Sequence, residues 1–205
     1  MRIILASSSA TRRRMLENAG LAFEAMPAAV DETAIKESAK AEGMAPAEAA
    51  TLLADAKAAR VARRHPEALV IGADQLLVQG SDWFDKPADL SAARAQLLRL
   101  RGHRHELPTA VVCWREGERA WHHVATPRLA MREFSEAFLD DYLAREAEHV
   151  TQSVGAYRIE GPGIALMREV QGDFFSILGL PLLPLLNYLQ DSKVFLSIKG
   201  GKNYQ

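Results

Sequence analysis

Apolar and polar positions follow two different periods along the 205-residue chain, and the pattern predicts strands interspersed with helices. Short runs rich in branched apolar residues predict strands at residues 3–6, 68–78, 109–115, 121–132 and 163–170. Segments bounded by capping residues, glycine or proline predict helices at residues 11–18, 46–64, 91–100 and 135–145, and a last helix that begins at Pro181.

This order of elements indicates the α/β class. The strands after residue 109 follow one another without a helix between them, so part of the sheet is expected to be antiparallel. We therefore predict a mixed, partly antiparallel twisted sheet with flanking helices. The length suits one large domain, or two small lobes that share a cleft, over residues 1–190. Residues 191–205 have no clear pattern, and we expect a poorly ordered or loosely attached C-terminal tail.

Composition and charge exclude several classes of partner and site. The chain is 48% hydrophobic and carries a formal net charge of -1, so no overall field favours nucleic acid or an anionic membrane. Cys113 is the only cysteine and lies in an apolar run, which excludes an internal disulfide and a multi-cysteine metal site. No segment has the length of a signal peptide or a membrane span, so we expect a cytoplasmic protein.

The segment ASSSATRRR at residues 6–14 places three arginines where a helix begins. Cations are disfavoured there by about 0.3–1 kcal/mol each, because the first turn exposes free N–H groups and the positive end of the helix dipole. A bound anion would remove the conflict, since amides, serine hydroxyls and guanidinium groups would converge on phosphate oxygens. Alternatively, Ser9 caps the helix while the arginines lie solvated on its outer face. This segment alone leaves both interpretations open.

Asp74 and Gln75 interrupt the apolar segment ALVIGADQLLV at residues 68–78. An ionised aspartate is rarely buried without a partner. A metal ion or a positioned water would supply one, which makes Asp74 a candidate ligand or general base at a cleft. The alternative is an aspartate at a strand end that accepts hydrogen bonds from loop amides.

Other polar positions carry little information by themselves. Asp31 and Glu32 occur in VDET among turn-forming and helix-capping residue types, Lys57 in an alanine-rich helix, and Lys86 in the turn FDKP. A solvated or capping role is the ordinary explanation for each. The histidine pairs at 103 and 105 and at 122 and 123 lack a third ligand at recognisable spacing, so we interpret them as surface or sheet-end residues rather than a metal site.

In their order along the chain, these motifs resemble those of the Maf family of nucleoside triphosphate pyrophosphatases. The resemblance covers residues 3 to about 189, through the segments ILASSSATRR, VDET, LADAKA, VIGADQ, DKP, GHRHELPT, VGAYRIEG and EVQGDFFSILGLP. It implies an α/β fold similar to inosine triphosphatases, with two lobes around a cleft. It also implies hydrolysis of the bond between the α and β phosphates of a nucleotide, giving a monophosphate and pyrophosphate with help from Mg²⁺ or Mn²⁺. Family members are often dimeric, so a homodimer is one expected state.

The resemblance implies roles for single residues. Asp74 matches the family's proton acceptor and, together with Glu32, would hold the metal. Phosphate binding is implied for a set of hydroxyl and cationic side chains, namely Ser7, Ser9, Arg12, Arg13, Lys57 and Lys86. These roles agree with the chemistry of phosphoryl transfer, which needs neutralised phosphate charge and an oriented water.

Substrate preference depends on a few positions within the resemblance. Gln75 and Glu160 stand where most members have threonine and glutamine, and this pair is similar to the branch that acts on 7-methyl-GTP. A carboxylate can accept hydrogen bonds from the N1–H and amine of guanine, and the methylated base is cationic. Thr11 stands where that branch typically has tryptophan, and Asp85 replaces a glycine before Lys86. A dTTP or UTP pyrophosphatase of the same family is the alternative.

Two functions of other classes are also considered. The chain could be a nucleotide-binding regulator of cell division without significant turnover, although it retains both acids and both lysines. It could be a nucleotidyltransferase, since those enzymes also pass from a first strand into an arginine-containing phosphate loop, but a second substrate would then be required. Analysis of the products from nucleotide alone separates the three functions.

Overall fold

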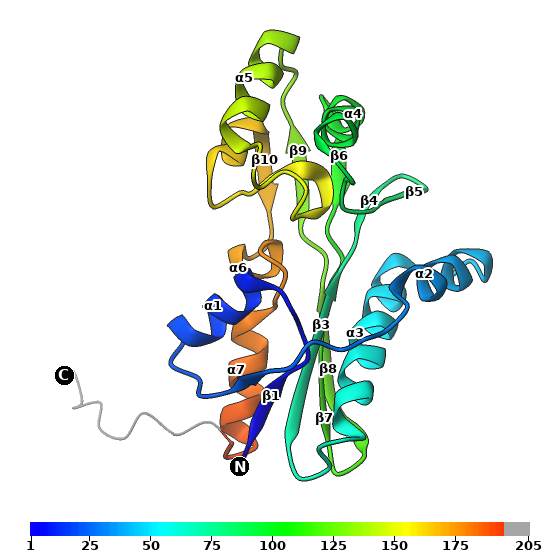
Figure 1. Ribbon diagram of the computed structural model, residues 1–205, viewed down its shortest axis with the longest axis vertical. Helices are drawn as coiled ribbons and strands as arrows, with labels where there is room; N and C mark the ends of the chain where they lie inside the picture. Colours follow the sequence, from blue (N-terminus) through cyan, green and yellow to red (C-terminus); the bar gives the residue numbers. More distant parts are fainter. Residues whose placement is uncertain (195–205) are drawn as a thin grey trace, which may run out of the picture.

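The computed structural model describes residues 1–194 and arranges them around two five-stranded sheets (Figure 1). The first sheet is mixed, because β1 runs parallel to β2 and β3 whereas β7 is antiparallel to β3 and β8. In spatial order its strands are β2 (Glu24–Ala25), β1 (Ile3–Leu5), β3 (Leu69–Gln75), β7 (Thr109–Arg115) and β8 (Glu118–Ala125).

The second sheet is antiparallel between all its neighbouring strands. In spatial order they are β10 (Met167–Gln171), β9 (Arg128–Met131), β6 (Arg104–Glu106), β4 (Leu77–Gln79) and β5 (Asp82–Phe84). The sequence pattern predicted one partly antiparallel sheet, and the structure has two sheets of which only the first contains parallel strands.

Three stretches of chain pass from one sheet into the other with a break of one or two residues. β3 and β4 are separated by Leu76, β6 and β7 by Leu107 and Pro108, and β8 and β9 by Thr126 and Pro127. Proline has no N–H to donate, so it ends a central ladder. The breaks are bonded to one another, since the amide of Leu76 donates to the carbonyl of Pro108 at 2.9 Å and that of Leu107 to Pro127 at 2.9 Å. They divide the molecule into two lobes (Figure 1).

Helices cover both faces of the first sheet (Figure 1). One face carries α1, α7 and the short α6, with Leu16, Ile71 and Leu185 in a shared core. The other carries α2 and α3, where alanines of α3 pack against β3 and β7. The helices are α1 (Ala10–Asn18), α2 (Glu32–Ala41), α3 (Pro46–Ala62), α6 (Phe174–Ile177) and α7 (Leu182–Asp191).

α3 lies unusually close to β3, and small residues on both elements allow this. A Cβ atom added to Gly72 would collide with the carbonyl oxygen of Ala54 and the side chain of Ala58. Residues two apart on a strand share a face, as do residues three or four apart on a helix. Asp74 therefore faces α3 from the same side of β3 as Gly72, and Lys57 faces β3 from the same side of α3 as Ala54.

The second lobe has its own core beneath two further helices. α4 (Leu90–Leu100) and α5 (Glu136–Glu146) bury Leu97, Leu139 and Tyr142 against the second sheet. Two short 3-10 turns, η1 (Val154–Ala156) and η2 (Pro162–Leu166), connect α5 to β10. Within residues 1–194, no helix is long and apolar enough to cross a membrane.

The α/β class and its partly antiparallel sheet are confirmed, but several predicted boundaries are wrong. The strands expected at 68–78 and 121–132 are each two strands in different sheets, and the first part of the strand expected at 163–170 is the 3-10 turn η2. α2 and the β4–β5 hairpin were not predicted. Most of the tail expected at 191–205 lies outside the described residues, which end at Val194.

Candidate active site

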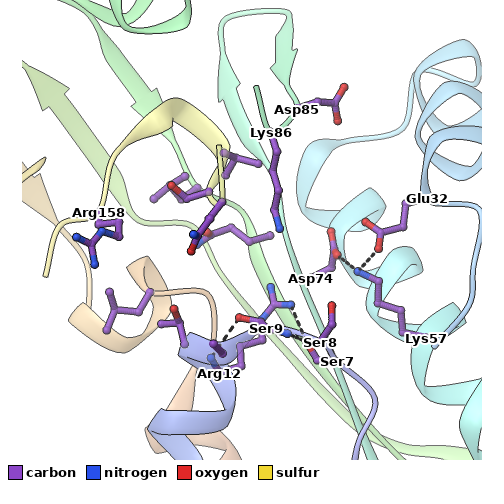
Figure 2. Close-up of a pocket in the computed structure, with 18 of the residues that line it drawn as sticks. Ser7, Ser8, Ser9, Arg12, Glu32, Lys57, Asp74, Asp85, Lys86 and Arg158 are labelled. Carbon is purple, nitrogen blue, oxygen red and sulfur yellow. Dashed lines mark hydrogen bonds and ion pairs between the residues drawn. The ribbon is translucent and has the colours of Figure 1, made fainter. Parts of the chain in front are cut away.

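A cavity of about 720 Å³ is lined by residues of both lobes (Figure 2). The first lobe contributes the loops after β1 and β2, the start of α1, one face of α2, one position on α3, two on β3, and the end of α6. The second lobe contributes the loop after β5 and the segment 152–160. Ten of the eleven positions named from the sequence line this cavity, namely Ser7, Ser9, Thr11, Arg12, Glu32, Lys57, Asp74, Gln75, Lys86 and Glu160.

The loop between β1 and α1 is held by its serines. Ser9 caps α1, because its Oγ accepts a hydrogen bond from the amide of Arg12 at 3.3 Å. The amide of Ser9 donates to Ser7 Oγ at 3.2 Å, so the two hydroxyls fix the loop in front of the helix N-terminus. The capping interpretation is therefore correct for Ser9, although it describes only part of this segment.

The three arginines have different environments. Arg12 reaches into the cavity, where its Nε donates to the carbonyl of Gly179 at 2.7 Å and its Nη1 to Ser7 Oγ at 3.4 Å. Burial lowers the pKa of Arg12, although the charges of Asp74 and Glu32 oppose this shift. Arg13 and Arg14 are exposed, and Arg13 Nε lies 3.7 Å from Glu17 Oε1. The structure thus does not bring Arg13 into the cavity, contrary to the role that the family resemblance implied.

Asp74, Lys57 and Glu32 form a connected group at the floor of the cavity (Figure 2). Lys57 Nζ lies 2.5 Å from Asp74 Oδ1 and 2.8 Å from Glu32 Oε1, and the side chains of Lys57 and Asp74 are 10% and 6% exposed. Burial raises the pKa of Glu32, but the hydrogen bond and charge of Lys57, with the charges of Lys36 and Arg12, outweigh it and lower the pKa overall. The partner that Asp74 required is therefore a lysine.

The two carboxylates suit a divalent cation in one respect. Both already point at a single positive group, the ammonium of Lys57, from two different elements. Hard cations such as Mg²⁺ prefer oxygen ligands, and they are commonly held by one or two carboxylates together with substrate phosphates. Among the described residues, no group of three or more acidic, histidine or cysteine side chains is placed to hold a metal by itself. Asp74 and Glu32 would thus be a partial site that phosphate oxygens complete.

Two further lysines add positive charge to the cavity, Lys86 from the second lobe and Lys36 from α2 of the first lobe. Figure 2 shows Lys86 reaching from the second lobe toward Asp74 and Arg12. Burial lowers the pKa of Lys86, and the charges of Arg12 and Lys57 lower it further while Glu32 and Asp74 oppose them. Lys36, which sequence reasoning missed, also lines the cavity, and its Nζ lies 2.7 Å from Asp85 Oδ1. The sequence signal for Lys36 was its position four residues after Glu32, because residues four apart share one face of a helix.

Gln75 lies at the junction of the two lobes, next to Asp74. Its Nε2 is within hydrogen-bond distance of Thr109 Oγ1 at 2.8 Å and of the carbonyl oxygens of Ser176 and Ile177 at 3.0 and 3.1 Å. The side-chain amide nitrogen therefore ties β3 to α6. The amide oxygen of Gln75 is the atom that remains to accept a hydrogen bond from a ligand.

Glu160 is exposed at the cavity, on a segment that buried groups anchor. Arg158 donates from Nε and Nη2 to the two carboxylate oxygens of Glu146 on α5, both at 2.8 Å. Glu146 is only 3% exposed, and this bidentate pair raises the pKa of Arg158. Gly155 and Ala156 both have a positive φ, of 80° and 58°, so the turn before Arg158 is sharp. The backbone next to Glu160 is thus anchored by the Arg158–Glu146 pair.

Tyr157 also anchors the segment that carries Glu160. Its hydroxyl lies 2.7 Å from His105 Nε2, and burial lowers the pKa of His105 to about 4, so the imidazole is neutral at pH 7. His105 is 2% exposed, which corrects the interpretation of this residue as a surface or sheet-end histidine. No sequence pattern indicated the Glu146–Arg158 or His105–Tyr157 pairs, because each joins residues of different elements.

Comparison with known proteins shows to which family this chain belongs. The model of the family described as Maf-like protein matches residues 2–192. This chain belongs to the Maf family. A nucleoside triphosphate pyrophosphatase of Granulibacter bethesdensis is 58% identical over 190 residues, or 93% of this chain and 96% of that protein. A 7-methyl-GTP pyrophosphatase of Rhizobium meliloti is 47% identical over 189 residues, or 92% of this chain and 95% of that protein.

A solved dITP/XTP pyrophosphatase from Mycobacterium abscessus overlaps this Maf-family structure more weakly. It has a TM-score of 0.42 and 16% sequence identity, and the overlap covers 65% of this chain and 76% of that chain. The architecture of this Maf-family protein is established by the sheets and helices described above.

Proposed function

We propose that this Maf-family protein is a nucleoside triphosphate pyrophosphatase, which hydrolyses the bond between the α and β phosphates of a nucleotide. The observation that carries the proposal is the convergence of buried charge in one cavity. Asp74, Lys57 and Glu32 form a linked group on one side, and the cations Arg12 and Lys86 reach toward it from two different lobes. The phosphate oxygens of a nucleotide could accept charge-assisted hydrogen bonds from both of these cations.

Asp74 is the residue we propose as the proton acceptor. As water attacks, a new P–O bond forms, the P–O bond to the bridging oxygen breaks, and one proton of the water passes to the Asp74 carboxylate. The products are a nucleoside monophosphate and pyrophosphate. Lys57 holds Asp74 in its rotamer through the 2.5 Å contact, while the second carboxylate oxygen stays available to the water.

Phosphate binding is proposed for the remaining polar groups. Ser7, Ser9 and Arg12 would contact the phosphates at the N-terminus of α1, where free amides and the helix dipole also favour an anion. Lys86 would contact them from the second lobe. Arg13 is left out of this set because it lies exposed beside Glu17. A divalent cation held by Asp74, Glu32 and phosphate oxygens supplies charge neutralisation when bound.

We propose 7-methyl-GTP as the preferred substrate. Glu160 lines the cavity and offers a carboxylate to the N1–H and amine of guanine, and Gln75 offers its amide oxygen. The name 7-methyl-GTP pyrophosphatase at 47% identity supports this choice. The relative at 58% identity is named only for nucleoside triphosphates, so dTTP or UTP remains the alternative. Thr11 lies at the same cavity but provides no aromatic ring to stack on a base.

The test is product analysis with nucleotide alone. Purified protein should convert 7-methyl-GTP with Mg²⁺ or Mn²⁺ to the monophosphate and pyrophosphate, and excess chelator should abolish turnover. Release of orthophosphate would contradict the proposed bond. Unchanged nucleotide would favour the regulator, and incorporation of the nucleotide into an added second substrate would favour the transferase.

Substrate choice needs a panel of specificity constants over 7-methyl-GTP, GTP, dTTP, UTP and CTP. A bound pyrimidine would cover the Glu160 carboxylate without giving it a hydrogen-bond donor, which costs roughly 1–3 kcal/mol, or about ten- to a hundredfold in specificity. Glu160→Gln should reduce the preference for 7-methyl-GTP, and the added change Gln75→Thr should shift it further toward pyrimidines. A wild type that prefers dTTP would refute the assignment of the base pocket.

The cytoplasmic location and the homodimer stay predictions.

A further inference from the structure

Lys36 is a cation of the cavity that the function proposed above leaves without a role. It lies on α2 one turn after Glu32, on the helix face that meets the cavity. Only 18% of its side chain is exposed, although lysine is seldom buried without a reason. Its ammonium group contacts Asp85, which belongs to the second lobe and directly precedes Lys86.

The contact with Asp85 leaves Lys36 with unused binding capacity. An ammonium group carries three N–H donors, and within residues 1–194 the Asp85 carboxylate is its one hydrogen-bond partner. The Asp85 side chain is 70% exposed, so water competes for it and the pair holds weakly. Because Lys36 is largely buried and its bond to the exposed Asp85 is weak, a more strongly charged anion can replace Asp85 as its partner.

Lys36 lies close to groups that are proposed to act on the phosphates, namely Glu32 and Lys86. Burial raises the pKa of Glu32, and the positive charge of Lys36 is among those that lower it, so Lys36 acts electrostatically on the acidic group at the floor. Through Asp85 it also lies beside Lys86. A departing pyrophosphate carries several negative charges that need positive groups on more than one side.

We propose that Lys36 binds the terminal phosphates of the nucleotide, and that Asp85 competes with them for its ammonium group. This deepens the proposed function and rests on it. When the substrate binds, a phosphate oxygen replaces Asp85 Oδ1 as the acceptor for Lys36 Nζ, and no covalent bond changes. Asp85 holds the lysine in place in the free protein and, for the same reason, lowers the affinity for phosphate.

A purely structural role for the pair makes a different prediction. α2 also touches the β4–β5 hairpin where Lys40 Nζ lies 5.3 Å from the centre of a Trp83 ring, so Lys36–Asp85 could be a second brace between these elements. Removal of either partner of a brace would loosen the cavity and weaken binding. Competition instead predicts opposite signs, because removal of Asp85 frees Lys36 for phosphate.

The experiment measures binding of inorganic pyrophosphate by calorimetry, which needs no turnover. Lys36→Gln should weaken binding about tenfold, the usual loss for one charge-assisted hydrogen bond. Asp85→Asn should tighten binding about two- to fivefold, as expected for release from an exposed ion pair. In the double variant, Asp85→Asn should add nothing, because its effect passes through Lys36. Lys40→Gln, on the same helix but outside the cavity lining, is the matched control and should change binding less than twofold.

Two results would overturn the proposal. One is a Lys36→Gln variant that binds pyrophosphate as tightly as the wild type or the Lys40→Gln control. The other is an Asp85→Asn variant that weakens binding, which is the signature of a brace; Asp85 is exposed, so this variant is expected to fold. Failure of the proposed function would be seen in a different measurement. A wild-type protein that forms no monophosphate from nucleotide would refute the pyrophosphatase activity, whatever its affinity for pyrophosphate.

Discussion

Lys57 on α3 and Asp74 on β3 meet in the interior, with Nζ 2.5 Å from Oδ1 and with the two residues 8% and 5% exposed. They are 17 positions apart in the chain, and they meet because Gly72 allows the helix to lie directly on the strand. A charge buried in this way is costly unless it is paired. The pair therefore keeps Asp74 in one orientation at the floor of the cavity.

We expect Asp74→Asn to reduce chemistry more than binding. The amide has the size of the carboxylate but cannot accept a proton from water, so kcat should fall about 100-fold or more while KM changes less than about tenfold. Steady-state kinetics on the folded variant test this. Asp82→Asn on β5, whose carboxylate is exposed and paired with Arg99, is the control. A kcat near that of the wild type would assign the proton to another residue.

Gly72→Ala should damage both stability and activity. The added methyl group collides with α3 at Ala54 and Ala58, and such overpacking costs about 1–3 kcal/mol of the free energy of unfolding. Because the helix must move away, Lys57 should separate from Asp74 and kcat should fall. Urea denaturation and kinetics on the same preparation measure the two effects. Full activity in a destabilised variant would mean that the close approach serves packing alone.

Nucleotide binding should weaken at alkaline pH through Lys86. Burial lowers the pKa of Lys86 below the ordinary 10.5, and a lysine with a lowered pKa loses its charge at a lower pH than a free lysine. KM should therefore rise with pH before ordinary lysines titrate. In Lys86→Arg the guanidinium stays charged, so this rise should be smaller. The measurement is KM from about pH 8 to about pH 11 for both proteins. Identical pH profiles of KM for the two proteins would mean that Lys86 does not cause the rise.

Glu146→Gln should affect recognition of the base and leave phosphate binding unchanged. It removes the carboxylate that accepts both hydrogen bonds from Arg158, so the segment that carries Glu160 loses its anchor. We expect KM for 7-methyl-GTP to rise about tenfold, a cost typical of a charge-assisted hydrogen bond, while pyrophosphate affinity stays within about twofold. Asp141→Asn, which removes an exposed pair on the same helix, is the control. Equal losses for nucleotide and pyrophosphate would indicate general unfolding of the cavity.

Local features of the sequence were sufficient for much of the fold. The helices at 11–18 and 135–145 and the strand at 109–115 depend on periodicity and caps, and they were predicted within one residue of their ends. The strands broken at Leu76 and Pro127 were predicted as continuous, because their apolar pattern continues across the break. Pro127 was the readable signal, since proline cannot take part in a central ladder.

The sequence by itself determined that a charged group in an apolar strand needs a partner, and that the start of α1 favours an anion. Both follow from local physics, namely the cost of burying Asp74 and the free amides of a first helical turn. Only the tertiary structure decided that the partner is Lys57, that Arg12 enters the cavity while Arg13 does not, and that Lys36 lies at Asp85. These contacts join elements distant in sequence, and their geometry is set by how closely helices and sheets pack, which no local pattern encodes.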